Sequence, residues 1–211
     1  MTMTPGLRKF AFTAHITFSV GWLGAVTGFL ALAVHGLTIQ DAQLVRGLYL
    51  AMGVTGWYVI VPLCLASLAT GLIQSLGTRW GLFRHYWVLT KFILTIVSAI
   101  ILFGFTQTLS YIGVLAADTT MPIEELRNLS QSPVLHSGGG LLVLLVNTTL
   151  SVYKPWGRTR YGLRKLQEQN KGLSSNRNSS TRKHWGRYIL FGLISLLLLF
   201  VVLHLVLRGS H

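Results

Sequence analysis

The stretch YWVLTKFILTIVSAIILFGFTQTLSYIGVLA, residues 86–116, decides the fold. A helix that crosses a membrane needs about 20 mainly apolar residues. This stretch is longer than that, and Lys91 is the one charged residue within it. The run therefore predicts a transmembrane helix with an ammonium group inside it.

Similar apolar runs occur at about 10–36, 47–76, 134–153 and 188–207. Of the whole chain 51% is hydrophobic and 11% is charged, whereas a soluble domain carries about 25% charged residues. We therefore expect an all-α, polytopic membrane protein. Residues 1–153 should form an antiparallel four-helix transmembrane bundle, residues 154–187 a basic cytoplasmic linker, and residues 188–207 a fifth transmembrane helix. Pro62, midway along the second span, should kink it.

The connections between the spans differ in positive charge. Fourteen lysines and arginines lie before the first span, between the second and third, and between the fourth and fifth, whereas three lie on the opposite side. Basic connections remain in the cytoplasm. We therefore expect the amino terminus in the cytoplasm and the carboxyl terminus outside. This distribution accounts for the net charge of +13 without nucleic acid as a partner.

The linker begins with aromatic residues among arginines and ends in a stretch rich in serine and asparagine. Its first part is expected to lie on anionic lipid headgroups, where each basic residue contributes about 1 kcal/mol. The expected partners are thus the lipid bilayer and its anionic headgroups, and assembly into a homo-oligomer stays open. The closing RGSH, residues 208–211, resembles the start of an affinity-tag linker and carries no functional weight.

Ionisable side chains inside the spans are the candidates for function, because each costs about 2.5 to 3.5 kcal/mol on insertion scales. His15 lies shortly after Lys9, and Lys91 lies shortly after Arg84. Both should therefore sit on the order of 10 Å inside the cytoplasmic boundary. His85, nearer that boundary, could face the same pocket. Two simpler interpretations stay open: the Lys91 stem reaches back to the headgroups, and His15 only hydrogen-bonds a neighbouring helix.

A further group of histidines lies near the outer side, where His136 begins the fourth span and His35 ends the first. Imidazoles on different helices can ligate a metal ion or haem iron, so His15 and His136 are the metal-ligand candidates. No aspartate or glutamate lies within a span, which argues against a carboxylate-driven cation pump. The sequence also lacks a phosphate-binding glycine loop, an HExxH zinc motif and a serine elbow.

Two motifs resemble those of a known superfamily. The segment AHITFSVGWLGAVTGFL, residues 14–30, resembles the His-x6-Trp-x-Gly signature of small bacterial helical membrane proteins, and HYWVLTKFILTIV, residues 85–97, resembles their Trp-x3-Lys helix. This CopD/HemJ-like superfamily includes protoporphyrinogen oxidases, copper-resistance proteins and uncharacterised families, and the whole chain resembles one of the latter most closely. The resemblance implies a protein of the bacterial cytoplasmic (inner) membrane that has a four-helix core with His15 as a haem or metal ligand. It also implies that Trp22 and Gly24 pack around that ligand and that Lys91 is its charged partner.

These observations predict a membrane protein that binds a b-type haem or related porphyrin inside the bundle, for electron transfer or porphyrin oxidation. Lys91 would pair with a propionate, and His136, His85 or Met52 would supply a second axial ligand. One alternative is a transporter of a small anion or metal ion, for which a lysine pocket without carboxylates favours an anion. The other is a structural or partner-binding membrane protein that has no cofactor and docks through the basic linker. Whether the chain is a redox enzyme stays open.

Overall fold

The computed structural model describes residues 3–77, 82–118, 120, 122, 126, 131–154 and 157–171. This part of the chain is helical and contains no strand. Four of its helices are long and apolar enough to cross a membrane: Pro5–Thr38, Ala42–Gly77, Tyr86–Ala117 and Ser132–Tyr153. Each of the first four predicted spans falls inside one of them, so the all-α, membrane-spanning character is confirmed. The predicted fifth span, 188–207, lies outside the described residues.

The ends of these helices follow from local sequence. Helix α1 (Pro5–Thr38) begins with a proline, which suits the first turn because its missing N–H would have no helical partner there. Helix α2 (Ala42–Thr55) begins after Asp41, whose carboxylate accepts the Leu44 N–H at 2.9 Å. Arg46 of α2 donates to the carbonyl oxygens of Ala116 and Asp118 at the end of α4 (Tyr86–Ala117). This arginine thus satisfies carbonyls that the helix leaves unpaired.

The second membrane-crossing helix is irregular at its middle. Between α2 and α3 (Val61–Gly77) lies a π-helical turn, η1 (Gly56–Ile60), and the Val61 N–H reaches back five residues to the Gly56 carbonyl. Pro62, which has no N–H, follows immediately. Trp57 in this turn donates its Nε1–H to Ser110 Oγ of α4 at 2.7 Å. The irregularity is therefore fixed by a contact with another helix as well as by the proline.

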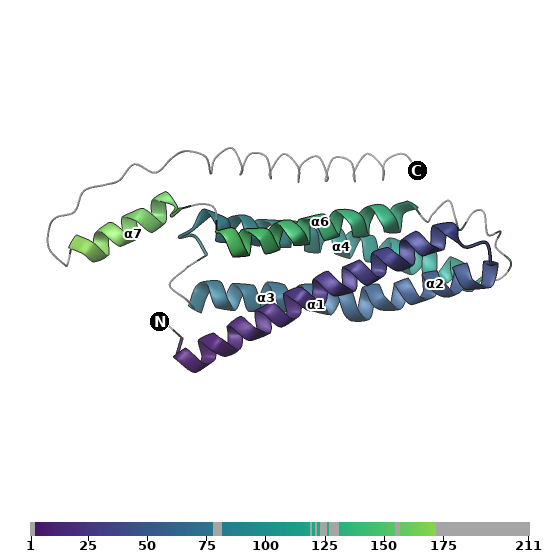
Figure 1. The fold of residues 1–211 in the computed structure, drawn as a ribbon, viewed down its shortest axis with the longest axis horizontal. Helices are drawn as coiled ribbons and strands as arrows, with labels where there is room; N and C mark the ends of the chain where they lie inside the picture. Colours follow the sequence, from purple (N-terminus) through teal and green to yellow (C-terminus); the bar gives the residue numbers. More distant parts are fainter. Residues whose placement is uncertain are drawn as a thin grey trace.

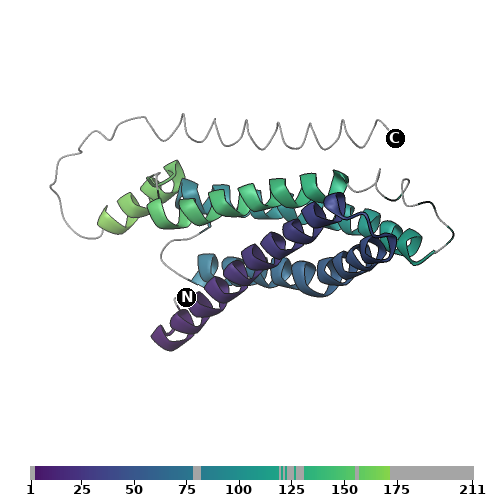
Figure 2. The same cartoon turned by 45° about the vertical axis from the view of Figure 1, so that its right-hand side comes forward.

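Helix α6 (Gln131–Tyr153) completes the bundle. Helix α1 packs against α2, α3 and α6, and α4 also packs against α2, α3 and α6, so the four long helices form a closed ring (Figures 1 and 2). The main core contains, among others, Trp22, Phe29, Tyr49, Met52, Phe105, Leu109 and Leu144. Only 17% to 28% of the residues in the most apolar window of each helix are buried inside the bundle. The remaining apolar surface faces outwards, as lipid contact requires.

A short helix, α7 (Arg160–Lys171), lies beyond the end of the bundle, at the same end as the amino terminus (Figure 1). Thr159 attaches it to the α3–α4 connection. The Thr159 N–H donates to the Arg84 carbonyl at 2.9 Å, and its hydroxyl donates to the Phe83 carbonyl at 2.5 Å. A Cβ at Gly162 would lie 2.5 Å from the Arg84 carbonyl oxygen. Glycine is thus required at this position for the two backbones to approach.

Candidate functional site

His15 lies half-buried on α1 and is turned toward α3. Its Nδ1 is 3.1 Å from the Ser67 carbonyl oxygen and 3.2 Å from Thr70 Oγ1. The Thr70 hydroxyl donates to the Ala66 carbonyl of its own helix at 2.6 Å. Because that proton is already used, Nδ1 must carry the proton that it donates to Ser67. Nε2 of the neutral ring then has no proton, which is the form in which a histidine ligates a metal.

Gly71 provides the space for this ring. A Cβ at position 71 would lie 3.0 Å from His15 Cε1. One turn further along α1, the Ser19 and Ser67 hydroxyls are 2.8 Å apart. The α1–α3 contact at this level is therefore polar, and it includes a small residue that the histidine needs.

Lys91 belongs to a second polar group, between α4 and α6, that we call the Lys91 cluster: Lys91, Thr95, Asn147 and Ser151. Lys91 Nζ donates to Ser151 Oγ at 2.5 Å, and Ser151 donates to the Asn147 carbonyl at 2.9 Å. One turn away, Asn147 Nδ2 donates to Thr95 Oγ1 at 3.3 Å. The same two helices also share a small apolar cluster: Trp87, Leu94, Val143, Val146 and Leu150.

His15 contacts the middle of α3, and Lys91 contacts the last turn of α6. No hydrogen bond joins the two within the described chain, because His15 bonds to α3 whereas Lys91 bonds to α6. The Lys91 stem reaches toward the last turn of α6 and ends at Ser151, between the two helices. The ammonium group is therefore held between α4 and α6 at the end of the bundle where α4 begins and α6 ends.

His85 does not join this pair. It immediately precedes α4 and forms an isolated antiparallel bridge with Arg158, beside the docking point of α7. Its ring lies 6.4 Å from the Trp87 ring, in a tilted arrangement. His85 thus belongs to the contact between α7 and the α3–α4 connection.

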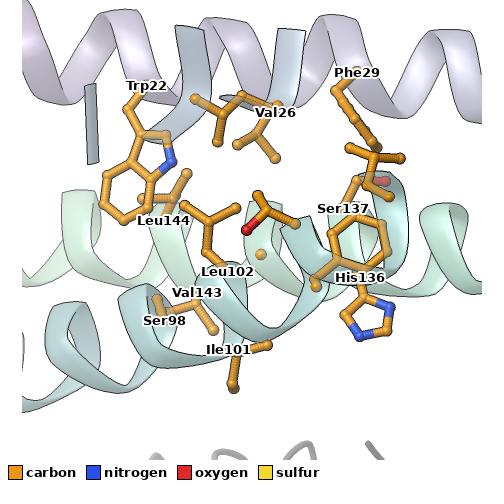
Figure 3. Close-up of a pocket in the computed structure, with 16 residues that line it drawn as sticks. Trp22, Val26, Phe29, Ser98, Ile101, Leu102, His136, Ser137, Val143 and Leu144 are labelled. Carbon is orange, nitrogen blue, oxygen red and sulfur yellow. The ribbon is translucent and has the colours of Figure 1, made fainter. Parts of the chain in front are cut away.

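Trp22 and His136 line a different feature, an apolar cavity of about 70 Å³ enclosed mainly by α1, α4 and α6. The two side chains lie at opposite ends of it, and the His136 ring points away from Trp22 (Figure 3). The His136 ring stacks on Phe105 with centroids 4.3 Å apart, and its Nδ1 bonds to the Ser132 carbonyl oxygen at 2.7 Å. His136 is therefore held by its own helix and by an aromatic neighbour.

These positions bear on the predicted haem and metal sites. His15 does not line the cavity, and the cavity is much smaller than the roughly 300 to 1,000 Å³ of typical cofactor pockets. His15 and His136 do not face a common point. Among the residues described, no group of three or more His, Cys, Asp or Glu side chains could hold a metal ion. The protonation of His15 suits an iron ligand, but the cavity that Trp22 and His136 line does not reach it.

Asn147, Ser151 and Thr95 were not among the site residues predicted from the sequence. A usable signal exists in their spacing, because Lys91 and Thr95 lie four residues apart on one helix and Asn147 and Ser151 lie four apart on another. Such pairs share a helix face. Which two faces meet depends on the packing of α4 against α6.

Searches with this chain matched no known protein family, no characterised protein and no solved structure. The resemblance to the CopD/HemJ-like superfamily therefore stays a prediction, and the function has to be argued from the residues themselves.

Proposed function

We propose that this protein is a transporter of small anions in the bacterial cytoplasmic membrane, and that it binds its substrate at Lys91. One observation carries the proposal: an ammonium group lies between two membrane-crossing helices, and its hydrogen bond goes to the neutral hydroxyl of Ser151. A charge at membrane depth without an opposite charge is costly and usually marks a function.

The predicted spans contain no acid that could neutralise Lys91. The five acidic residues of the chain all lie outside the predicted and observed spans: Asp41, Asp118, Glu124, Glu125 and Glu168. An anion bound from solution would supply the missing charge and would reduce the desolvation cost of the ammonium group.

The arrangement of the bundle supports access from the cytoplasm. Lys91 pairs with Ser151, and Thr95 pairs with Asn147, so the residues of α4 and α6 meet in reverse order. This order is expected if consecutive spans are antiparallel. The excess of basic residues at the amino-terminal end supports a cytoplasmic location for that end, and Lys91 lies close to it in the proposed orientation.

Anion flux into proteoliposomes would test this function. Wild-type protein should accelerate the entry of a permeant anion, and Lys91→Met should abolish that acceleration because it removes the charge and keeps a stem of similar length. Lys9→Met is the matched control, since Lys9 is exposed at the start of α1. Equal flux through wild type and Lys91→Met would refute the proposal.

His15 favours a second candidate, a b-type haem protein. Its Nδ1–H bond to the Ser67 carbonyl would orient Nε2 toward a metal. A bound haem would supply reversible one-electron chemistry. Absorbance of protein purified from haem-replete cells tests this candidate. A Soret band that is lost in His15→Ala but kept in His35→Ala supports it, and colourless protein after haemin addition refutes it.

A further inference from the structure

The hydroxyl protons of the Lys91 cluster are already used within the two helices. Thr95 donates to the Lys91 carbonyl at 2.8 Å, and Ser151 donates to the Asn147 carbonyl at 2.9 Å. Each hydroxyl has a single proton to give. Both hydroxyl oxygens therefore act as acceptors in the cluster, Ser151 for the ammonium group and Thr95 for the Asn147 amide.

This assignment fixes the orientation of the Asn147 amide. Its NH₂ group must face Thr95, because Thr95 has no proton left for the amide oxygen. Asn147 is only 8% exposed. Its Oδ1 is shielded from solvent and has no hydrogen-bond partner in the described part of the chain. Since buried acceptors are almost always paired, Oδ1 marks a position for a donor from outside the cluster.

The ammonium group supplies complementary donors one helical turn away. It carries three N–H bonds, of which one reaches Ser151. Lys91 and Thr95 are four residues apart, so the Lys91–Ser151 and Thr95–Asn147 pairs are separated by about 6 Å along α4. Two hydrogen bonds of about 2.8 Å each can bridge this separation through one small molecule. That molecule must accept from Lys91 and donate to Asn147.

We infer that the Lys91 cluster binds a small oxyanion that carries its own O–H group, of the bicarbonate type. Its charged oxygens accept from Lys91, and its hydroxyl donates to Asn147 Oδ1. This inference rests on the proposed function and specifies its substrate class. Chloride or nitrate would pair with Lys91 but leave Oδ1 without a donor, whereas water would satisfy Oδ1 but leave the ammonium charge uncompensated. An anion with a hydroxyl group meets both requirements.

Bicarbonate and nitrate form a matched pair for the test, because both are planar, monovalent oxyanions and only bicarbonate has an O–H. The apparent affinity of each is obtained from the anion-dependent rise in melting temperature of detergent-solubilised protein, at one pH and one ionic strength. The cost of leaving a buried acceptor unpaired corresponds to a difference in binding affinity of about 5-fold to 150-fold. We expect bicarbonate to bind more tightly than nitrate by a factor in this range.

Three variants test which residues cause the preference for bicarbonate over nitrate. Asn147→Leu should reduce bicarbonate affinity to the level of nitrate, Ser151→Ala should weaken both anions alike, and Lys91→Met should abolish both. Equal, Lys91-dependent binding of the two anions overturns the inference and leaves the proposed function intact. A bicarbonate preference that survives Asn147→Leu also overturns it. If neither anion binds to wild type, both the inference and the proposed function are overturned. If Asn147→Leu does not fold, the comparison of bicarbonate with nitrate on wild type decides the inference alone.

Discussion

Replacing Lys91 with methionine should leave the ligand-free protein about as stable as wild type, or more stable. The variant is relieved of an ammonium group that costs about 2.5 to 3.5 kcal/mol in a membrane. It loses one charged hydrogen bond, to Ser151, which contributes about 1.5 to 3 kcal/mol. The Ser151 proton remains bonded to the Asn147 carbonyl, so no buried donor loses its partner. The free energy of unfolding of Lys91→Met should therefore differ from that of wild type by between about −0.5 and +2 kcal/mol, where a positive value means that the variant is more stable.

Thermal unfolding in mild detergent, followed by tryptophan fluorescence, measures this difference. For a chain of this length, about 1 kcal/mol shifts the melting temperature by about 2 to 4 °C. Lys91→Met should thus melt between about 2 °C below and 8 °C above wild type, and only wild type should gain stability from a bound anion. Ser151→Ala is the comparison variant, because it removes the Lys91–Ser151 hydrogen bond and the Ser151 bond to the Asn147 carbonyl but keeps the ammonium group. A fall of more than about 5 °C in Lys91→Met would show that the lysine is needed for folding, and the anion proposal would lose the observation that carries it.

Two other predictions concern the ends of the bundle. Gly162→Ala places a Cβ 2.5 Å from a backbone oxygen, so α7 should undock and the Thr159 amide should exchange its hydrogen about 5 to 150 times faster, through the loss of two hydrogen bonds. Gly157→Ala has open space and is the control; equal exchange in the two variants would contradict the docking. Hydrogen bonds from the Thr120 hydroxyl and N–H, together with a nearby arginine, hold the pKa of Asp118 below its ordinary value of 3.8. The resulting stabilisation is present above about pH 4 and is lost as the pH falls through the lower folded-state pKa. Thr120→Val should raise this pKa in an NMR titration of the carboxyl group, and an unchanged value would refute the assignment.

The sequence located the described spans because apolar length alone distinguishes a membrane helix. It was less accurate at their ends. The first helix begins at Pro5 and the second at Ala42, each five residues before its predicted span. A helix continues beyond the apolar region as far as a proline or a capping side chain, here Pro5 and Asp41, allows. Pro62 predicted an irregular second helix, but the π-helical turn over Gly56–Ile60 also involves the Trp57–Ser110 contact, which requires knowledge of the packing.

The candidate site was predictable in its charged members and not in its neutral ones. Lys91 stood out because a charge in an apolar run is rare. Asn147 did not, since neutral polar residues in spans commonly bond to their own helix, as the Thr27 and Thr149 hydroxyls do. His136 was predicted as a metal ligand because it, too, is an ionisable residue within an apolar span. Its ring stacks on Phe105, which lies about 30 positions away in the sequence, and this contact can be known only from the tertiary fold.

The absence of acids from the spans connects the site with the charge of the whole chain. A lysine paired with a buried carboxylate would already be neutralised, and it would attract an anion only weakly. Within the described residues Lys91 is bonded to a neutral hydroxyl and not to a carboxylate, so under the proposed function its compensation would come from a ligand. The predicted cytoplasmic segments carry fourteen basic residues and one acid, Glu168, and a positive surface at the entrance of a cleft raises the local concentration of anions. The same residues that orient the helices in the membrane would therefore supply the cytoplasmic end of the bundle with the ligand that Lys91 requires, and this supply should weaken as ionic strength rises.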